Sequence, residues 1–196
     1  MIFYKIVNPS LQKQITSIAS FSENEIEMID SCFEYESFKA KEFLSEMGKT
    51  NNKIFFIVEG LARVYYLKDG KEITTYLSCD DGFIASYSSF INQTQSFENI
   101  QCIEDCEVLS ITFEKMQFLY KEIPNWERVG RILAEQNYLC MADRVLKLQM
   151  IPAKEKYQTF LASAPAKIIQ RTPLIYIASF LGITPESLSR IRQDIS

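Results

Sequence analysis

Apolar residues recur every third or fourth position near the end of the sequence, which predicts helices there. Thr172-Pro173 and Thr184-Pro185 each combine a hydroxyl suited to capping with a proline suited to the first helical turn. Gly182 lies between them, where a tight turn requires left-handed backbone, and Ala178 is small enough to let a second helix cross closely. The pattern predicts two short helices joined at Gly182. Their shared core would contain Ile177, Leu181, Ile183, Leu188 and Ile191.

The second predicted helix has a polar face opposite Leu188 and Ile191. Glutamate can accept a hydrogen bond from the cytosine amino group, and arginine can donate two hydrogen bonds to guanine. This face therefore fits base edges in a DNA major groove. The alternative is an ordinary solvated face of a helical hairpin. We favour DNA reading because caps, turn and apolar spacing all agree. The candidate DNA-binding residues are Thr184, Glu186, Ser187, Ser189, Arg190, Arg192 and Gln193.

Residues 37–112 change to short alternating runs about ten residues apart, a spacing typical of an antiparallel sandwich or barrel. Glu59-Gly60 and residues 68–71 are hairpin turn signals. A jelly-roll barrel is the favoured interpretation. The predicted strands cover residues 38–44, 53–58, 61–67, 72–77, 83–87, 97–103 and 108–112.

Helical spacing flanks these strands, over residues 21–29 before them and 113–120, 125–150 and 153–162 after them. A helix of about 25 residues spans roughly 38 Å. This is too long for a small barrel to cover, so we expect part of its apolar face to pack on a second copy. The expected fold is therefore α+β, with a barrel sensor domain at 1–123, a dimerisation helix at 124–150 and a helix-turn-helix domain at 151–196.

The charge of the chain is divided unequally along its length. The net charge is −4, but residues 1–143 carry 13 Lys and Arg against 22 Asp and Glu, whereas residues 144–196 carry 8 against 3. A basic segment on an acidic body suits a DNA-binding domain attached to a sensor. No apolar run is long enough to span a bilayer and no signal-peptide core follows Met1, so we expect a cytoplasmic protein without a membrane partner.

The chain contains no histidine, which excludes Ser-His and Cys-His nucleophile pairs and most zinc, iron or copper enzyme sites. Its five cysteines are scattered, without a CxxC pair, so neither a disulfide framework nor a zinc ribbon is indicated. Cys102 and Cys106 form the closest pair, and buried free thiols are the favoured interpretation over a metal or redox site. We therefore expect no enzyme, no metal and no cofactor.

The segments 177–192 and 55–65, together with the predicted barrel and long helix, resemble the Crp/Fnr family of bacterial transcription regulators. The resemblance implies a cyclic-nucleotide-binding-type barrel, a homodimer through the long helix, and recognition helices that enter successive major grooves of an inverted repeat. Glu186, Ser189 and Arg190 match the Glu-x-x-Ser-Arg pattern by which family members read bases. RNA polymerase is a further candidate partner.

Two departures from the family pattern change the expectation. Cyclic-nucleotide-binding members carry Gly-Glu-Leu and then Arg-Ser or Arg-Thr, but residues 82–90 lack the glutamate and residues 95–97 lack the arginine. A buried phosphate would be poorly paired without that arginine, so cyclic AMP is not an expected ligand. Hydroxyls here suit a small uncharged or weakly charged effector, although such loops are also common without a ligand. The candidate effector-pocket residues are Ser86, Tyr87, Ser88, Ser89, Gln95 and Ser96.

The second departure is that the sequence stops at Ser196, so we expect the helix-turn-helix domain to lack its last wing. DNA backbone anchoring would then depend more on Lys167, Arg171 and Arg192. The predicted function is a sequence-specific transcription regulator with an unidentified effector, or with that sensing role lost. The alternative is a stand-alone small-molecule-binding module with a degenerate helix-turn-helix. A cupin-type enzyme is the least favoured alternative because its metal is normally held by histidines.

Overall fold

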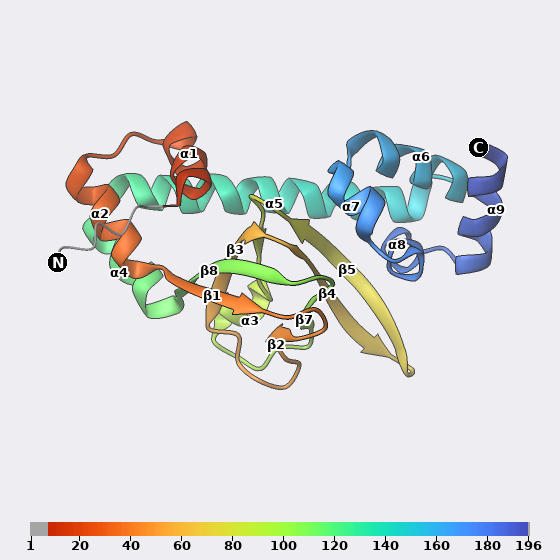
Figure 1. The fold of residues 1–196 in the computed structure, drawn as a ribbon, viewed down its shortest axis with the longest axis horizontal. Helices are drawn as coiled ribbons and strands as arrows, with labels where there is room; N and C mark the ends of the chain where they lie inside the picture. Colours follow the sequence, from red (N-terminus) through yellow and green to blue (C-terminus); the bar gives the residue numbers. More distant parts are fainter. Residues whose placement is uncertain (1–7, 196) are drawn as a thin grey trace.

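The computed structural model describes residues 8–195 and has an α+β fold, with antiparallel sheets between two groups of helices (Figure 1). The sheets have the strand orders β1-β8-β3-β6 and β2-β7-β4-β5, and all pairings are antiparallel, as predicted. The strands are β1 (Glu34–Phe38), β2 (Phe43–Ser45), β3 (Lys53–Glu59), β4 (Leu61–Lys68), β5 (Lys71–Cys79), β6 (Phe83–Ile84), β7 (Asn99–Cys102) and β8 (Cys106–Thr112).

Apolar side chains from both sheets form one core between them. This core includes Phe55 and Val108 of the first sheet and Val64 and Ile100 of the second, all nearly inaccessible to solvent. Gly60 joins β3 to β4 at φ 134°, and a Cβ there would lie 2.6 Å from the sulfur of Cys106. The predicted turn at Gly60 is present, but the predicted hairpin was wrong, because β3 and β4 lie in different sheets and the chain crosses from one sheet to the other there. Only glycine fits this crossing without displacement of the neighbouring chain.

Two predicted strands were wrong in their extent. The run 38–44 is divided by a turn in which Lys41 has φ 73°, so β1 ends before it and β2 starts after it. The run 83–87 stays extended only over β6, after which the chain forms the short helix α3 (Tyr87–Asn92). Alternation alone did not reveal these breaks, because a turn of two or three residues leaves the alternating pattern nearly intact.

The helices gather at the two ends of α5, which runs along the length of the molecule (Figure 1). Its N-terminal part packs against α1 and α4, and the C-terminal helices follow its other end. The predicted helix start at Ser22 is confirmed by a capping box with Glu25. The helices besides α3 are α1 (Pro9–Ile18), α2 (Glu23–Cys32), α4 (Phe113–Glu122), α5 (Pro124–Met150), α6 (Ala153–Ser163), α7 (Ala166–Arg171), α8 (Leu174–Leu181) and α9 (Pro185–Ile195).

The two halves of α5 differ in burial. Trp126 and Val129 in the first half are buried against α4 and the N-terminal helices. Gly130 lets the Tyr120 ring lie against the helix, since a Cβ at this glycine would be 2.3 Å from the Tyr120 hydroxyl. The second half leaves a set of large apolar side chains exposed to solvent. They are Tyr138, Leu139, Val145, Leu146 and Met150.

The C-terminal helices cover the free edge of β5, the last strand of its sheet. The Thr74 amide donates to Ser179 Oγ at 2.9 Å, and Ser179 Oγ donates to the Glu72 carbonyl at 3.0 Å. Arg144 Nη2 donates to the carbonyl oxygens of Thr74 and Phe180 at 3.2 and 3.0 Å. Side chains of α8 and α5 thus pair backbone groups that an edge strand would otherwise leave unpaired.

Candidate DNA-reading helix and ligand cavity

The helix α9 carries most of the candidate DNA-binding residues on its outer face. Leu188 and Ile191 are buried against the rest of the C-terminal helices, as predicted. Gly182 has φ 65° and ends α8, which confirms the predicted turn. The opposite side of α9 is exposed to solvent. Its exposed candidate residues are Thr184, Glu186, Ser189, Arg190, Arg192 and Gln193.

The start of α9 is held by its own side chains. Thr184 Oγ1 accepts from the Ser187 amide at 3.2 Å, so the predicted cap at Thr184 is confirmed. The Thr184 hydroxyl also donates to Ser187 Oγ at 3.1 Å, which holds Ser187 at the helix start. The pKa of Glu186 is lowered, chiefly by its own backbone amide and then by Thr184, so this carboxylate is ionised and able to accept.

The predicted cap at Thr172 was wrong. The cap residue of α8 is Pro173, and the Thr172 hydroxyl is buried without a hydrogen-bond partner among residues 8–195. A proline at the cap position leaves the threonine one residue too early to reach the amides of the first turn. The helix forms nevertheless, because its buried residues Ile177, Ala178 and Leu181 pack against the neighbouring helices.

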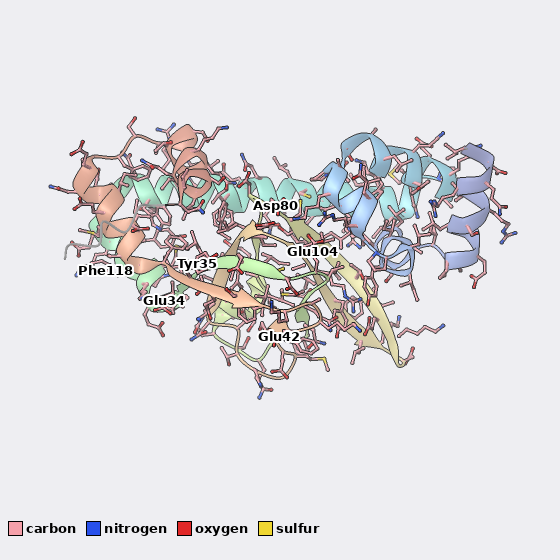
Figure 2. All side chains as sticks on the ribbon, in the orientation of Figure 1. Glu34, Tyr35, Glu42, Asp80, Glu104 and Phe118 are labelled. Atoms are coloured by element: carbon pink, nitrogen blue, oxygen red, sulfur yellow. The ribbon has the colours of Figure 1, made fainter. Side chains whose placement is uncertain are left out.

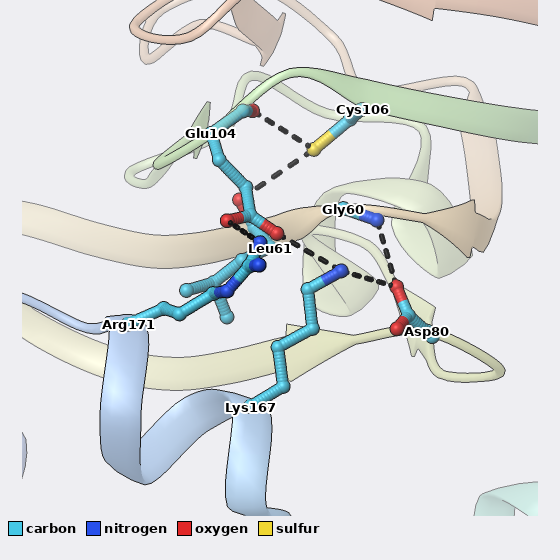
Figure 3. A network of polar contacts seen from close by, with 7 residues as sticks. All are labelled: Gly60, Leu61, Asp80, Glu104, Cys106, Lys167 and Arg171. Carbon is cyan, nitrogen blue, oxygen red and sulfur yellow. Dashed lines mark hydrogen bonds and ion pairs between the residues drawn. The ribbon is translucent and has the colours of Figure 1, made fainter.

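Two of the expected phosphate anchors contact the barrel instead. Lys167 Nζ lies 2.7 Å from Asp80 Oδ1 and 2.9 Å from Glu104 Oε1, and Arg171 Nη1 lies 2.9 Å from Glu104 Oε2 (Figure 3). Figure 2 shows Asp80 and Glu104 on the part of the barrel that faces α7. The sequence did not place these acids near α7, because their separation along the chain exceeds 60 residues. Lys167 and Arg171 are therefore not free cations in this arrangement.

Three of the expected effector-pocket hydroxyls are buried and bonded within the loop. Ser96 Oγ lies 2.8 Å from Ser86 Oγ and 2.8 Å from the Glu98 carbonyl oxygen. Ser89 Oγ accepts from the Asn51 amide at 2.9 Å and donates to the Thr94 carbonyl at 2.5 Å. These serines fix the conformation of residues 86–98, so their hydroxyls have little capacity left for a ligand.

The other candidates lie at the surface of two cavities. Ser88 lines both cavities, Tyr87 lines the larger one, and Gln95 lines the smaller one. The smaller cavity, of about 300 Å³, is bordered mainly by residues 86–98. The structure thus brings all six candidates into one loop region at a cavity wall. Ser86, Ser89 and Ser96 also line the smaller cavity, but their hydroxyls are already bonded to protein groups.

The larger cavity, of about 580 Å³, lies between the barrel and α5 and was not predicted in this form. Its walls include Tyr76 of β5, Phe83 of β6, and Trp126 and Leu133 of α5. The apolar stripe on the inner side of α5 is the only sequence signal for it, and that stripe equally predicts a core or dimer contact. Sequence spacing does not distinguish a side chain that fills a core from one that borders a void.

Burial changes the chemistry of the cavity walls. Desolvation raises the pKa of Tyr76, Tyr87 and Tyr120, so these phenols stay neutral at physiological pH and offer hydroxyl groups rather than charges. Residues 8–195 contain no cluster of acidic and cysteine side chains arranged for a metal ion. Cys102 and Cys106 are buried free thiols in the core between the sheets.

The fold is a barrel of the cyclic-nucleotide-binding type joined by a long helix to a helical C-terminal region. Residues 35–122 match the family model described as cyclic nucleotide-binding domain. A comparison with curated proteins found no match. Within residues 8–195, no helix combines the length and apolar character needed to cross a membrane.

Solved structures with this fold include members of one group of bacterial regulators. FixK2 from Bradyrhizobium japonicum is 18% identical, with a TM-score of 0.73 over 83% of this chain and 84% of that one. The c-di-GMP-responsive global regulator CLP from Xanthomonas campestris is 13% identical, with a TM-score of 0.70 over 89% and 91%. A protein from Eubacterium rectale described as a Crp/Fnr-family transcriptional regulator is 16% identical, with a TM-score of 0.65 over 88% and 82%. At these identities the likeness is one of fold.

Proposed function

We propose that this chain is a dimeric, sequence-specific DNA-binding transcription regulator of Crp/Fnr type. The observation that carries the proposal is the geometry of α9. Its buried side holds Leu188 and Ile191, and its exposed side presents Glu186, Ser189 and Arg190 in one row. A short helix held this way at the edge of a domain fits a major groove, where the acid and the arginine can each pair with a base edge.

The proposed dimer would use the exposed apolar residues on the second half of α5. Leu139, Leu146 and Met150 are separated by seven and four residues, which places them on one side of the helix. Each is more than half exposed, and the three together favour a second copy of α5 as their cover. A two-fold dimer would present two α9 helices to half-sites about 34 Å apart.

Cyclic AMP is not the proposed effector. Residues 82–90 and 95–97 lack the glutamate and the arginine that would pair with its ribose and phosphate, and Ser86 and Ser96 are bonded to each other there. Among residues 8–195, no lysine or arginine lines either cavity. The free energy lost by removing a phosphate from water without a cation would exceed the free energy gained from the available neutral hydrogen bonds.

The test is selection of bound duplexes from a random DNA pool at near-physiological salt, followed by sequencing. We expect an enriched inverted repeat with half-sites one helical turn apart. Arg190→Ala should weaken binding to that repeat by about 1–3 kcal/mol and relax one base position.

Arg128→Ala is the matched control, because Arg128 is an exposed arginine on the first half of α5, far from α9 (Figure 1). It should leave the selected sequence unchanged. If the wild-type protein enriches no sequence, either alone or with 4-phenylbutylamine present, the stand-alone binding module is favoured.

A further inference from the structure

Among the residues that the structure describes, one formally charged side chain lines the larger cavity, the carboxylate of Glu98. Glu98 lies just before β7, is partly buried, and borders both cavities. Every other residue lining the larger cavity is apolar, aromatic or a neutral polar residue. The cavity therefore has a negative charge at one place and an apolar surface over most of the rest.

The contacts of Glu98 leave that charge uncompensated. Its Oε1 accepts from Thr75 Oγ1 at 3.3 Å and its Oε2 accepts from Ser86 Oγ at 3.2 Å. Both donors are neutral hydroxyls, and both bonds are long. In the part of the chain that the structure describes, no lysine or arginine forms an ion pair with Glu98. A carboxylate has room for about four hydrogen bonds, so acceptor positions remain for a ligand.

The apolar walls determine what the uncharged part of the ligand must be. Phe83, Leu133 and Met116 offer aliphatic and aromatic surface, and Trp126 and Tyr76 offer ring faces. A volume of about 580 Å³ falls within the range of small-molecule sites. Near a partly desolvated carboxylate an anion is repelled and a cation is attracted more strongly than in bulk water. A ligand that matches both features has a cationic head and an apolar body.

We propose that this cavity binds an amphiphilic amine whose ammonium group pairs with Glu98 and whose apolar body lies between the barrel and α5. This reverses the ligand charge that a cyclic nucleotide would bring. It also departs from the uncharged or weakly charged effector expected from the sequence, because the ammonium group carries a full positive charge. The inference names the effector class of the proposed regulator and rests on that function only for its regulatory meaning, since binding is measured without DNA.

The experiment uses three probes that share one body and differ in charge: 4-phenylbutylamine, 4-phenyl-1-butanol and 4-phenylbutyrate. Trp126 is the only tryptophan of the chain and lines the cavity, so its fluorescence reports occupancy. We expect saturable binding of the amine, about tenfold or more tighter than the alcohol, because hydrogen bonds to charged groups are the stronger ones. The acid should bind most weakly. Calorimetry should give one amine per chain.

Glu98→Gln removes the charge and keeps the shape of the side chain. It should reduce the preference for amine over alcohol to about one while alcohol binding and the melting temperature persist. Glu46→Gln is the matched control, because Glu46 is exposed, pairs with Lys49 and lines neither cavity. The proposal is overturned if the acid binds as tightly as the amine, if Glu98→Gln leaves the preference unchanged, or if none of the probes binds saturably.

The amine result and the DNA result separate the two proposals. Amine binding that depends on Glu98 upholds the cavity assignment even if the duplex selection fails. An enriched inverted repeat without amine binding upholds the regulator and overturns the cavity assignment.

Discussion

The barrel is covered at both ends by helices, but the two contacts are built differently. At the N-terminal end, Ile15, Ile29 and Leu119 are completely buried with Phe33 and Trp126 in one apolar cluster. At the C-terminal end, Leu61 and Leu77 also join an apolar cluster with the C-terminal helices. That cluster is accompanied by directed polar contacts between the barrel and the C-terminal helices, which we call the β5 seam. Its members are Arg63, Glu72, Thr74, Asp80, Glu104, Arg144, Lys167, Arg171, Tyr176 and Ser179.

The two contacts therefore draw on different kinds of interaction. Apolar burial is non-directional and its loss exposes the whole surface to water at a large cost. Polar groups of the β5 seam can exchange their partners for water when the C-terminal helices move, so each bond contributes only about 0.5–1.5 kcal/mol net. The N-terminal helices are thus held mainly by apolar burial, whereas the C-terminal region is held by apolar burial together with polar contacts that water can replace.

The largest effect should come from the N-terminal cluster. Leu119→Ala removes a completely buried side chain and should lower the free energy of unfolding by about 2–5 kcal/mol, from lost burial plus the cavity left behind. Denaturant titration measures this change. Phe118→Ala, at an exposed neighbouring position on α4, is the control and should change stability by less than about 0.5 kcal/mol. Equal losses for the two would contradict the assigned core.

The next effect should come from Arg63 at the centre of the β5 seam. Its guanidinium is buried between the rings of Tyr65 and Tyr176, at 4.0 and 3.6 Å, and Nη2 binds Glu72 at 2.6 Å. Arg63→Ala should cost about 2–4 kcal/mol because it removes both the packing and the charge.

Arg63→Met separates these two contributions. It should cost less than the alanine variant, because methionine fills part of the space and the Arg63 Nε and Nη1 groups have no partner within residues 8–195. The comparison is made by denaturant titration of both variants. A methionine variant as unstable as the alanine variant would mean that charge, and not packing, holds this part of the seam.

A smaller effect is expected at Ser179. Ser179→Ala leaves the Thr74 amide and the Glu72 carbonyl without their partner and should cost about 1–3 kcal/mol. It should also speed proteolytic cleavage between the barrel and the C-terminal helices. Ser163→Ala is the matched control, since within residues 8–195 the Ser163 hydroxyl bonds only the Thr159 carbonyl one turn earlier. Indistinguishable stability and proteolysis of the two variants would show that the edge contact is dispensable.

The smallest effect concerns pH and the ion pair of Asp80 with Lys167. Burial tends to raise the pKa of Asp80, but hydrogen bonds from Lys167 and the Gly60 amide outweigh it and hold the pKa below its ordinary value of 3.8. A lowered folded-state pKa contributes stability above that ordinary value, and the contribution is lost as the pH falls through the folded-state pKa. The pair is partly exposed, so the loss should be less than about 1 kcal/mol.

Asp80→Asn tests this pH dependence. The difference in unfolding free energy between wild type and variant should shrink as the pH falls from about 6 to about 3. A difference that stays constant over that range would assign the effect of Asp80 to its shape rather than its charge.

The order of strands and helices could largely be predicted because periodicity and turn residues report local structure. The alternating runs, the Gly60 and Gly182 turns and the Ser22 cap were all visible in the sequence. The short helices α1, α3 and α7 were missed. Both α3 and α7 have six residues, too few to show a periodic stripe, and contacts with the rest of the chain decide such segments.

The exposed face of α9 could be predicted from the sequence, whereas the roles of Lys167 and Glu98 could not. The face of α9 follows from spacing within one helix, so its exposed row could be derived residue by residue. The roles of Lys167 and Glu98 depend on what lies across a tertiary contact. Lys167 pairs with two acids of the barrel, and Glu98 borders a cavity. Local sequence predicts neither contact.

At the bulge in β5, neighbouring residues contact the larger cavity and the C-terminal helices. The register between β4 and β5 shifts at Val64/Tyr65, which leaves Thr75 as the extra residue. Thr75 borders the larger cavity, while the backbone of the adjacent Thr74 is held by Ser179 and Arg144 at the free edge of the strand. Adjacent residues of β5 therefore contact the cavity and the C-terminal helices. A ligand that displaced Thr75 would therefore shift the backbone that bonds Ser179 of α8, without a change in the rest of the barrel.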